Sequence, residues 1–139
     1  MILLDTNVIS EVLRPTPAVP VRRWMTRQPR EDLVTAAICE AELAFGVALL
    51  PPGLRRRALE EAISAIFDDV FIGRVLPFDR AAAAAYAEIR AARRRIGRPI
   101  DALDAQIAAI ARIHGAAVAT RNVDDFADCR IDVLDPWRD

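Results

Sequence analysis

The sequence has no lysine, a single histidine and two cysteines. All 19 basic residues are arginine, and His114 is the only histidine in the 139-residue chain. A metal site built from several histidines is therefore excluded. Cys39 and Cys129 lie far apart in the sequence and form no metal-ligand pair, so we expect two reduced core thiols and no disulfide.

Long apolar runs are also absent. No stretch approaches the roughly 20 apolar residues that a membrane-spanning helix needs, and Met1 leads directly into an apolar strand pattern rather than a secretion signal. We therefore expect a cytoplasmic protein without a membrane partner. With 53% hydrophobic and 28% charged residues, the chain is typical of a folded globular protein. Its length predicts one domain over residues 1–139.

The net charge of −1 conceals two separated charge populations. The arginines gather in two clusters, which together contain Arg55, Arg56, Arg57, Arg90, Arg93, Arg94, Arg95 and Arg98. The acids concentrate after strand-like segments and in the tail, as at Asp124, Asp125, Asp128, Asp132, Asp135 and Asp139. Such a chain can bind a metal in its acidic region and a polyanion in its basic one. For any single arginine, however, a solvated helix face is the better interpretation.

Strand-like and helix-like segments alternate along the chain. Short apolar strand patterns occupy residues 2–4, 33–35, 75–76, 116–119 and 133–134, and helical patterns occupy residues 8–13, 21–28, 38–50, 54–67, 79–97 and 101–115. Asp79 and Asp101 suit helix N-caps, and Gly115 suits the end of the last helix. The alternation predicts an α/β fold, in which helices sandwich a central parallel sheet and the crossovers are right-handed.

Acidic side chains follow the predicted strands, at the ends where parallel sheets place their ligand sites. Asp5 comes directly after the first strand, Glu42 lies early in the helix after the second, and Asp104 lies in the first turn of the last helix. The strand that ends at Thr120 is followed by Asn122, Asp124 and Asp125. Because the carboxyl ends of parallel strands share one edge of the sheet, we expect these groups to converge.

Each acid alone has a simpler explanation. Asp5 suits a cap for the helix that follows, Glu42 a solvated helix position, and Asp104 a favourable interaction with the helix dipole. Together, however, clustered carboxylates raise one another's pKa unless a cation lies among them. Oxygen ligands with hardly any histidine or cysteine favour Mg²⁺ or Mn²⁺ as that cation.

Four segments, in the right order and at the right spacing, resemble the signature segments of the PIN domain. They read L-L-D-T-N-V-I, A-E-L-A-F-G, D-A-L-D-A-Q-I-A-A and A-T-R-N-V-D-D-F. The resemblance is closest to the VapC-type toxins of bacterial toxin–antitoxin pairs, and among them to the FitB-like proteins. It extends over the whole chain, including V-L-P-F-D in the middle and D-P-W-R-D at the end. It implies a single PIN-like nuclease domain with a three-layer α/β/α sandwich.

The resemblance also implies an activity and partners. A protein of this kind would be an Mg²⁺- or Mn²⁺-dependent endoribonuclease that hydrolyses RNA phosphodiester bonds and is neutralised by a cognate antitoxin. A homodimer is implied as well, and binding to operator DNA only through the antitoxin. The family's acidic site falls here on Asp5, Glu42 and Asp104. The usual fourth acid is replaced by Asn122, so its carbonyl oxygen, Asp124 or Asp125 would have to serve instead, and a second metal position is in question.

In the mechanism that we expect, Asp5 and Asp104 hold one cation, and Glu42 binds it or orients a bound water. Metal ions held in this way lower the pKa of bound water and stabilise charge on the scissile phosphate. Thr6, Asn7 and Thr120 are expected to hydrogen-bond the carboxylates. The arginine clusters are expected to contact the RNA backbone through Arg55, Arg56, Arg57, Arg93, Arg94 and Arg95, unless one cluster faces the antitoxin or a second protomer.

Three other interpretations compete with this one. A phospho-acceptor receiver domain also gathers acids at strand ends, but it needs a lysine near its last strands and this chain has none. A catalytically degenerate PIN-like protein could act only as a partner in a DNA-binding repressor complex, and the Asn122 departure is the one observation that supports it. A nuclease that cuts DNA is the nearest enzymatic alternative.

Overall fold

A five-stranded parallel sheet forms the centre of the molecule in the computed structural model, which describes residues 1–138. Its strands are β1 (Ile2–Leu4), β2 (Leu33–Ala36), β3 (Val75–Leu76), β4 (Ala117–Ala119) and β5 (Val133–Leu134). They lie in the order β3-β2-β1-β4-β5, and every neighbouring pair is parallel. All five predicted strands are confirmed, while the tail acid Asp139 lies outside the described residues.

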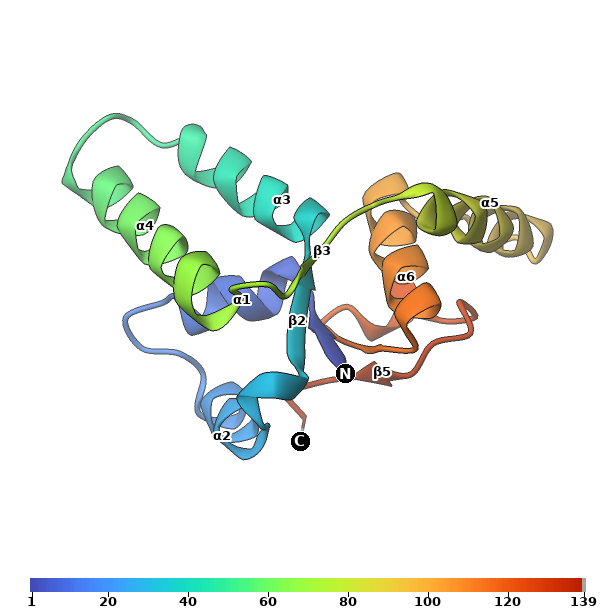
Figure 1. The fold of residues 1–139 in the computed structure, drawn as a ribbon, viewed down its shortest axis with the longest axis horizontal. Helices are drawn as coiled ribbons and strands as arrows, with labels where there is room; N and C mark the ends of the chain where they lie inside the picture. Colours follow the sequence, from blue (N-terminus) through green and yellow to red (C-terminus); the bar gives the residue numbers. More distant parts are fainter. Residues whose placement is uncertain (139) are drawn as a thin grey trace.

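Six helices cover the two faces of this sheet. Four of them lie on one side, namely α1 (Thr6–Val12), α2 (Val19–Arg27), α3 (Ala37–Ala48) and α4 (Leu54–Ala65), and two lie on the other, α5 (Arg80–Arg95) and α6 (Ala102–His114) (Figure 1). The predicted three-layer α/β/α sandwich is thus confirmed. The chain runs from β1 outward through β2 to β3 and then crosses to β4, so β1 and β4 are neighbours whose connections leave in opposite directions. Open α/β sheets bind ligands beyond the carboxyl ends of the strands at such a switch point.

The ends of the last two helices follow the predicted capping. The Asp79 carboxylate accepts a hydrogen bond from the Ala82 N–H at 3.0 Å, and Asp101 accepts one from Leu103 N–H, also at 3.0 Å. Gly115 ends α6 in the left-handed conformation, with φ of 65°. These caps fix where α6 begins, and therefore hold Asp104 in its first turn at the carboxyl edge of the sheet.

The core combines the apolar strands with a small-residue face of α6. Leu3, Leu4 and Val118 are almost fully buried, and so are Ala105, Ala108, Ala109 and Ala111. Alanine faces let a helix approach its neighbours closely, and α6 packs against both α5 and β4. Cys39 and Cys129 are buried free thiols, as expected.

Two segments differ from the predicted pattern. The helix expected over residues 54–67 leaves the α-helical path after Ala65 and continues as a π-helical turn, η2 (Ile66–Val70). The expected loop after Thr120 contains a short 3₁₀ helix, η3 (Val123–Phe126), because Phe126 turns into the core and is 1% exposed. Within residues 1–138, no helix has the length and apolar character needed to cross a bilayer.

Candidate metal centre

Asp5 lies at the switch point between β1 and β4. Its backbone N–H donates to the Ala119 carbonyl at 3.0 Å, which extends the pairing of the two strands by one residue. Its carboxylate accepts hydrogen bonds from the Thr6 N–H and the Thr120 hydroxyl, both at 2.8 Å, and from the Asn7 side-chain amide at 3.3 Å. Asp5 therefore caps α1, as its simpler interpretation held, and is also fixed by three donors at the mouth of a cavity.

Glu42 approaches Asp5 from α3. Its carboxylate accepts a hydrogen bond from the Thr6 hydroxyl at 2.9 Å, so Thr6 contacts both acids. One ligand atom each of Asp5, Glu42 and Cys39 lie within 4.8 Å of one another. Two carboxylates from separate elements are thus close enough to share one cation.

Asp104 completes the acidic site from α6. It is half-buried, and it lines a cavity of about 540 Å³ together with Asp5, Glu42 and Asn122. Asp104 does not belong to the tight group of Asp5, Glu42 and Cys39 among the described residues. Asp104 therefore lines the same cavity from α6, outside that tight group.

The electrostatics of the cavity favour a cation. Burial is the largest cause that raises the pKa of Asp5, of Glu42 and of Asp104, and the charges of neighbouring carboxylates add to it. For Asp104 the pKa reaches about 7, with Asp5 as the largest charge contribution. Three acids of raised pKa that offer oxygen atoms fit a hard divalent ion such as Mg²⁺ or Mn²⁺, because its charge would relieve their repulsion.

The fourth position is occupied by Asn122, as the sequence indicates, and its side chain lines the acid cavity. Its backbone N–H donates to the Thr120 hydroxyl at 3.1 Å. Asp125 is close enough for its charge to raise the pKa of Asp5 and Asp104. Asp124 and Asp125 both line a neighbouring cavity instead, so Asn122 is the best placed of the three candidates to offer a fourth oxygen.

The three predicted supporting residues all contact the acids or one another. Asn7 donates to Thr120 at 3.2 Å as well as to Asp5, and its side-chain oxygen accepts the Arg121 N–H at 3.2 Å. Thr6, Asn7 and Thr120 therefore tie the start of α1 to the end of β4. Such a network fixes the direction in which the acids present their oxygens.

Cys39 is a neighbour of the site that the sequence interpretation placed only in the core. It precedes Glu42 by three residues on α3, a spacing that puts both on one helix face and could have indicated this position. Burial and the charge of Asp5 raise the pKa of its thiol to about 11. Cys39 is thus a neutral thiol at neutral pH and a poor ligand for a hard cation.

Comparison with known proteins gives the family. A model of the PIN domain matches residues 2–131. The chain belongs to the PIN-domain family. It is 45% identical to Toxin FitB of Neisseria gonorrhoeae over 139 residues, which cover 100% of both chains. It is 41% identical to VapC ribonuclease Y4jK of Sinorhizobium fredii over 137 residues, which cover 99% of this chain and 98% of that protein.

Solved structures of PIN domains agree with this assignment. The structure of FitAB bound to an IR36 DNA fragment matches with a TM-score of 0.93 and 44% identity, covering 99% of this chain and 96% of that one. The predicted membership of the VapC-type, FitB-like PIN domains is therefore confirmed.

The arginine clusters of this PIN domain contain exposed side chains and side chains that form contacts within the fold. Arg55, Arg57, Arg94 and Arg95 are exposed. Arg56 is tied to Glu60 at 2.9 Å, and donates to the Leu50 carbonyl at 3.3 Å.

Arg93 is not available to RNA, so its inclusion among the RNA-contacting residues was wrong. Arg93 is buried, with 4% of its surface exposed. Its side chain donates to the backbone carbonyls of Arg98, Asp125 and Ala127 at 2.6, 3.0 and 2.9 Å. This arginine has a structural role, because it holds the segment that follows η3 against α5.

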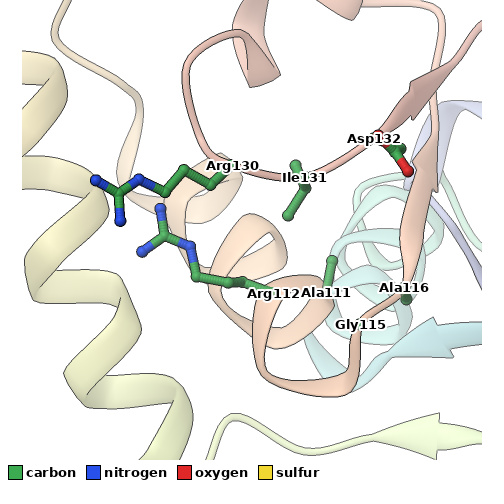
Figure 2. A pocket seen from close by; sticks show the side chains of 7 residues that line it. All are labelled: Ala111, Arg112, Gly115, Ala116, Arg130, Ile131 and Asp132. Atoms are coloured by element: carbon green, nitrogen blue, oxygen red, sulfur yellow. The ribbon is translucent and has the colours of Figure 1, made fainter.

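Two other hollows border the PIN domain's sheet. An apolar groove of about 680 Å³ between α1, α3 and α4 is continuous with the acid cavity, since Thr6, Ser10, Arg14 and Glu42 line both. A cavity of about 310 Å³ lies at the opposite edge, where β4 and β5 begin. Figure 2 shows that Arg112 and Arg130 extend side by side there, with Asp132 apart from them. A cavity lined by two guanidinium groups and one carboxylate does not suit a cation.

Proposed function

We propose that this PIN domain is a divalent-metal-dependent endoribonuclease, the toxin of a toxin–antitoxin pair. The observation that supports it most is the convergence of Asp5, Glu42 and Asp104 on one cavity at the switch point, with the pKa of each carboxyl raised. Acids in that arrangement favour a bound cation, and the chain's relative in Sinorhizobium fredii is named a ribonuclease.

The chemistry assigns separate tasks to the residues of the cavity. Asp5, Glu42 and Asp104 would hold one Mg²⁺ or Mn²⁺ ion by carboxylate oxygens, and Asn122 would offer its amide oxygen. When bound, the ion supplies Lewis acidity toward the scissile phosphate and a water molecule of lowered pKa. Thr6, Asn7 and Thr120 keep the carboxylates in place, because they donate to Asp5 and Glu42 within the network described above.

The substrate would also meet exposed positive charge outside the cavity. Arg55, Arg57, Arg94 and Arg95 are the exposed members of the two clusters, and Arg56 is half-buried. Contacts between arginines and phosphates weaken as salt is added, because binding releases counterions from the RNA. We expect RNA binding to be salt-dependent for this reason.

The partner would be a cognate antitoxin that covers the apolar groove. Leu13, Leu43, Val47, Leu59 and Ile63 line this groove, and Glu42 links it to the acid cavity. A protein segment seated there would bury apolar surface and close the entrance to the acids at the same time. The toxin would act as a homodimer, and operator DNA would be bound through the antitoxin.

The test is cleavage of a mixed RNA pool by the purified protein in Mn²⁺, in Mg²⁺ and in chelator. Cleavage should require the ion and be lost in Asp5→Asn, a variant that keeps the size of the side chain and removes its charge. Asp132→Asn, at the opposite edge of the sheet, is the matched control and should cut normally. Cleavage that survives in Asp5→Asn would contradict the proposal.

A second function is favoured by the amide at the fourth position. A PIN domain with Asn122 in place of the acid could bind its partner without cutting RNA. In that case the protein would neither cut RNA nor bind Mn²⁺. Restoring the acid with Asn122→Asp would then be required for ion binding.

A further inference from the structure

Arg121 lies between two residues of the acidic site. Thr120 donates to Asp5, and Asn122 lines the acid cavity. The backbone N–H of Arg121 itself donates to the side-chain oxygen of Asn7 at 3.2 Å. The main chain of Arg121 is therefore held by the same network that positions the acids.

The side chain of Arg121 is held by an indole ring. Its guanidinium carbon lies 5.2 Å from the centroid of the Trp137 ring, a cation–π contact. Trp137 is half-buried and packs against the core, and its backbone N–H donates to the Asp135 carboxylate at 2.9 Å. Both Arg121 and Trp137 line the acid cavity. The indole thus fixes a positive charge at the rim of a negatively charged site.

Arg121 is the cation of this rim that has no anionic partner. The other arginine that lines the cavity, Arg14, forms an ion pair with Glu11 at 3.1 Å. Within residues 1–138, Arg121 forms no ion pair, although four carboxylates line its cavity, those of Asp5, Glu11, Glu42 and Asp104. Its guanidinium donors are therefore free for an anion that enters the site from solvent.

Arg121 and Asn122 also line the neighbouring cavity, which contains Asp124, Asp125 and the ion pair between Arg138 and Asp135. Arg121 therefore belongs to the linings of both cavities, each of about 540 Å³. An RNA strand that extends from the acids past Arg121 would bring a neighbouring phosphate to this guanidinium group. The planar guanidinium also offers a surface on which an unpaired base can stack.

We propose that Arg121 binds a phosphate of single-stranded RNA next to the scissile bond, and that Trp137 positions Arg121 for this contact. The inference rests on the proposed ribonuclease function and adds to it a residue outside the two arginine clusters. A stacked, unpaired base requires a single strand at this contact.

The experiment measures RNA binding without cleavage. A fluorescein-labelled single-stranded RNA of mixed sequence is titrated with protein in the Asp5→Asn background and in chelator, and its anisotropy is followed over a range of salt concentrations. Arg121→Gln should weaken binding about tenfold, because one charged hydrogen-bonding contact is lost. The slope of log affinity against log salt should fall in magnitude by about 0.7, the value for one phosphate on a single strand.

Three comparisons make the result specific. Arg23→Gln, which changes an exposed arginine on α2 outside both cavities, should leave the affinity unchanged. Trp137→Leu should weaken binding less than Arg121→Gln does, and Trp137→Phe, which restores an aromatic face, should recover most of the loss. Double-stranded RNA of the same sequence should bind equally to the Asp5→Asn protein with and without Arg121→Gln.

Equal affinity and equal salt slope for Arg121→Gln and its parent would overturn the inference and leave the ribonuclease proposal intact. If the parent protein bound no RNA and the wild-type protein cut none, the ribonuclease proposal itself would fail, and this inference with it.

Discussion

Arg112 at one edge of the central sheet and the three acids at the other differ in whether the fold itself balances their charge. At the amino edge, Arg112 (labelled in Figure 2) donates to the Cys129 carbonyl at 3.1 and 2.7 Å and pairs with Glu88 at 3.3 Å, so its charge is satisfied within the fold. At the carboxyl edge, burial and the charge of Asp5 raise the pKa of Glu42 and of Asp104 in a shared cavity. The difference indicates that a functional site lies where the fold leaves like charges close together, since a bound ligand of opposite charge can then balance them.

Removal of one carboxylate at each edge should give the largest difference in the rate of RNA cleavage. Asp104→Asn should lower metal-dependent RNA cleavage by more than about a hundredfold, because changes even in groups that only support metal ligands cost 10–100-fold. Asp132→Asn should stay within about twofold of the wild type, as an exposed acid outside the site. Initial rates of cleavage of one labelled RNA measure both. Similar losses in the two variants would remove the distinction between the edges.

Arg93 should give the largest change in stability. Arg93→Met leaves the carbonyls of Arg98, Asp125 and Ala127 without their donor, and we expect the free energy of unfolding to fall by about 3 kcal/mol. Its exposed neighbour provides the control, since Arg94→Met should change stability by less than about 0.5 kcal/mol. Urea denaturation of the metal-free proteins measures both values. An unchanged midpoint for Arg93→Met would show that the buried guanidinium is dispensable.

The carboxyl edge should also make stability and ion binding depend on pH. The pKa of Asp104 is about 7 in the fold against an ordinary value of 3.8. Between these values the folded protein holds a proton that the unfolded chain has lost, so the metal-free protein should lose stability as pH rises from about 4 to 7. The loss should be smaller in Asp104→Asn. Thermal unfolding at pH 5, 6, 7 and 8 in chelator compares the two proteins, and identical pH profiles would contradict the assignment.

Mn²⁺ binding should depend on the same proton of Asp104, but it should strengthen as the pH rises. The ion requires the carboxylate form, so its affinity for the wild type should rise by up to tenfold per pH unit until about pH 7. Calorimetric titration at pH 6 and 7 measures this change. An affinity that does not vary with pH would exclude Asp104 as a ligand that must lose a proton.

Cys39 should give the smallest effect of all. Its thiol lies beside Asp5 and Glu42, but its pKa of about 11 keeps it protonated at neutral pH. Cys39→Ala should therefore leave the Mn²⁺ dissociation constant within about twofold of the wild-type value, because a neutral thiol adds little to a hard ion. A loss of affinity beyond tenfold in calorimetry would place the sulfur among the ligands.

The sequence predicted the sheet, the helices and the convergence of the acids, because the spacing of apolar residues, the helix caps and the position of an acid after a strand are local signals. It misplaced Arg93, although the buried stripe of α5 passes through Ala82, Ala85, Ile89 and Arg93 at helical spacing. That prediction gave the positive charge of arginine more weight than its position in the buried repeat of the helix. The 3₁₀ helix η3 and the stacking of Arg121 on Trp137 depend on contacts between distant segments, which no local pattern reveals.

The most direct test of the account is the position of a bound ion. Crystals grown with Mn²⁺ and measured at a wavelength where manganese scatters anomalously locate it without reference to activity. We predict one anomalous peak among the carboxylates of Asp5, Glu42 and Asp104, within reach of Asn122. A peak elsewhere, or no peak in protein that has been saturated with Mn²⁺, would contradict the claim that this edge of the sheet is a metal centre.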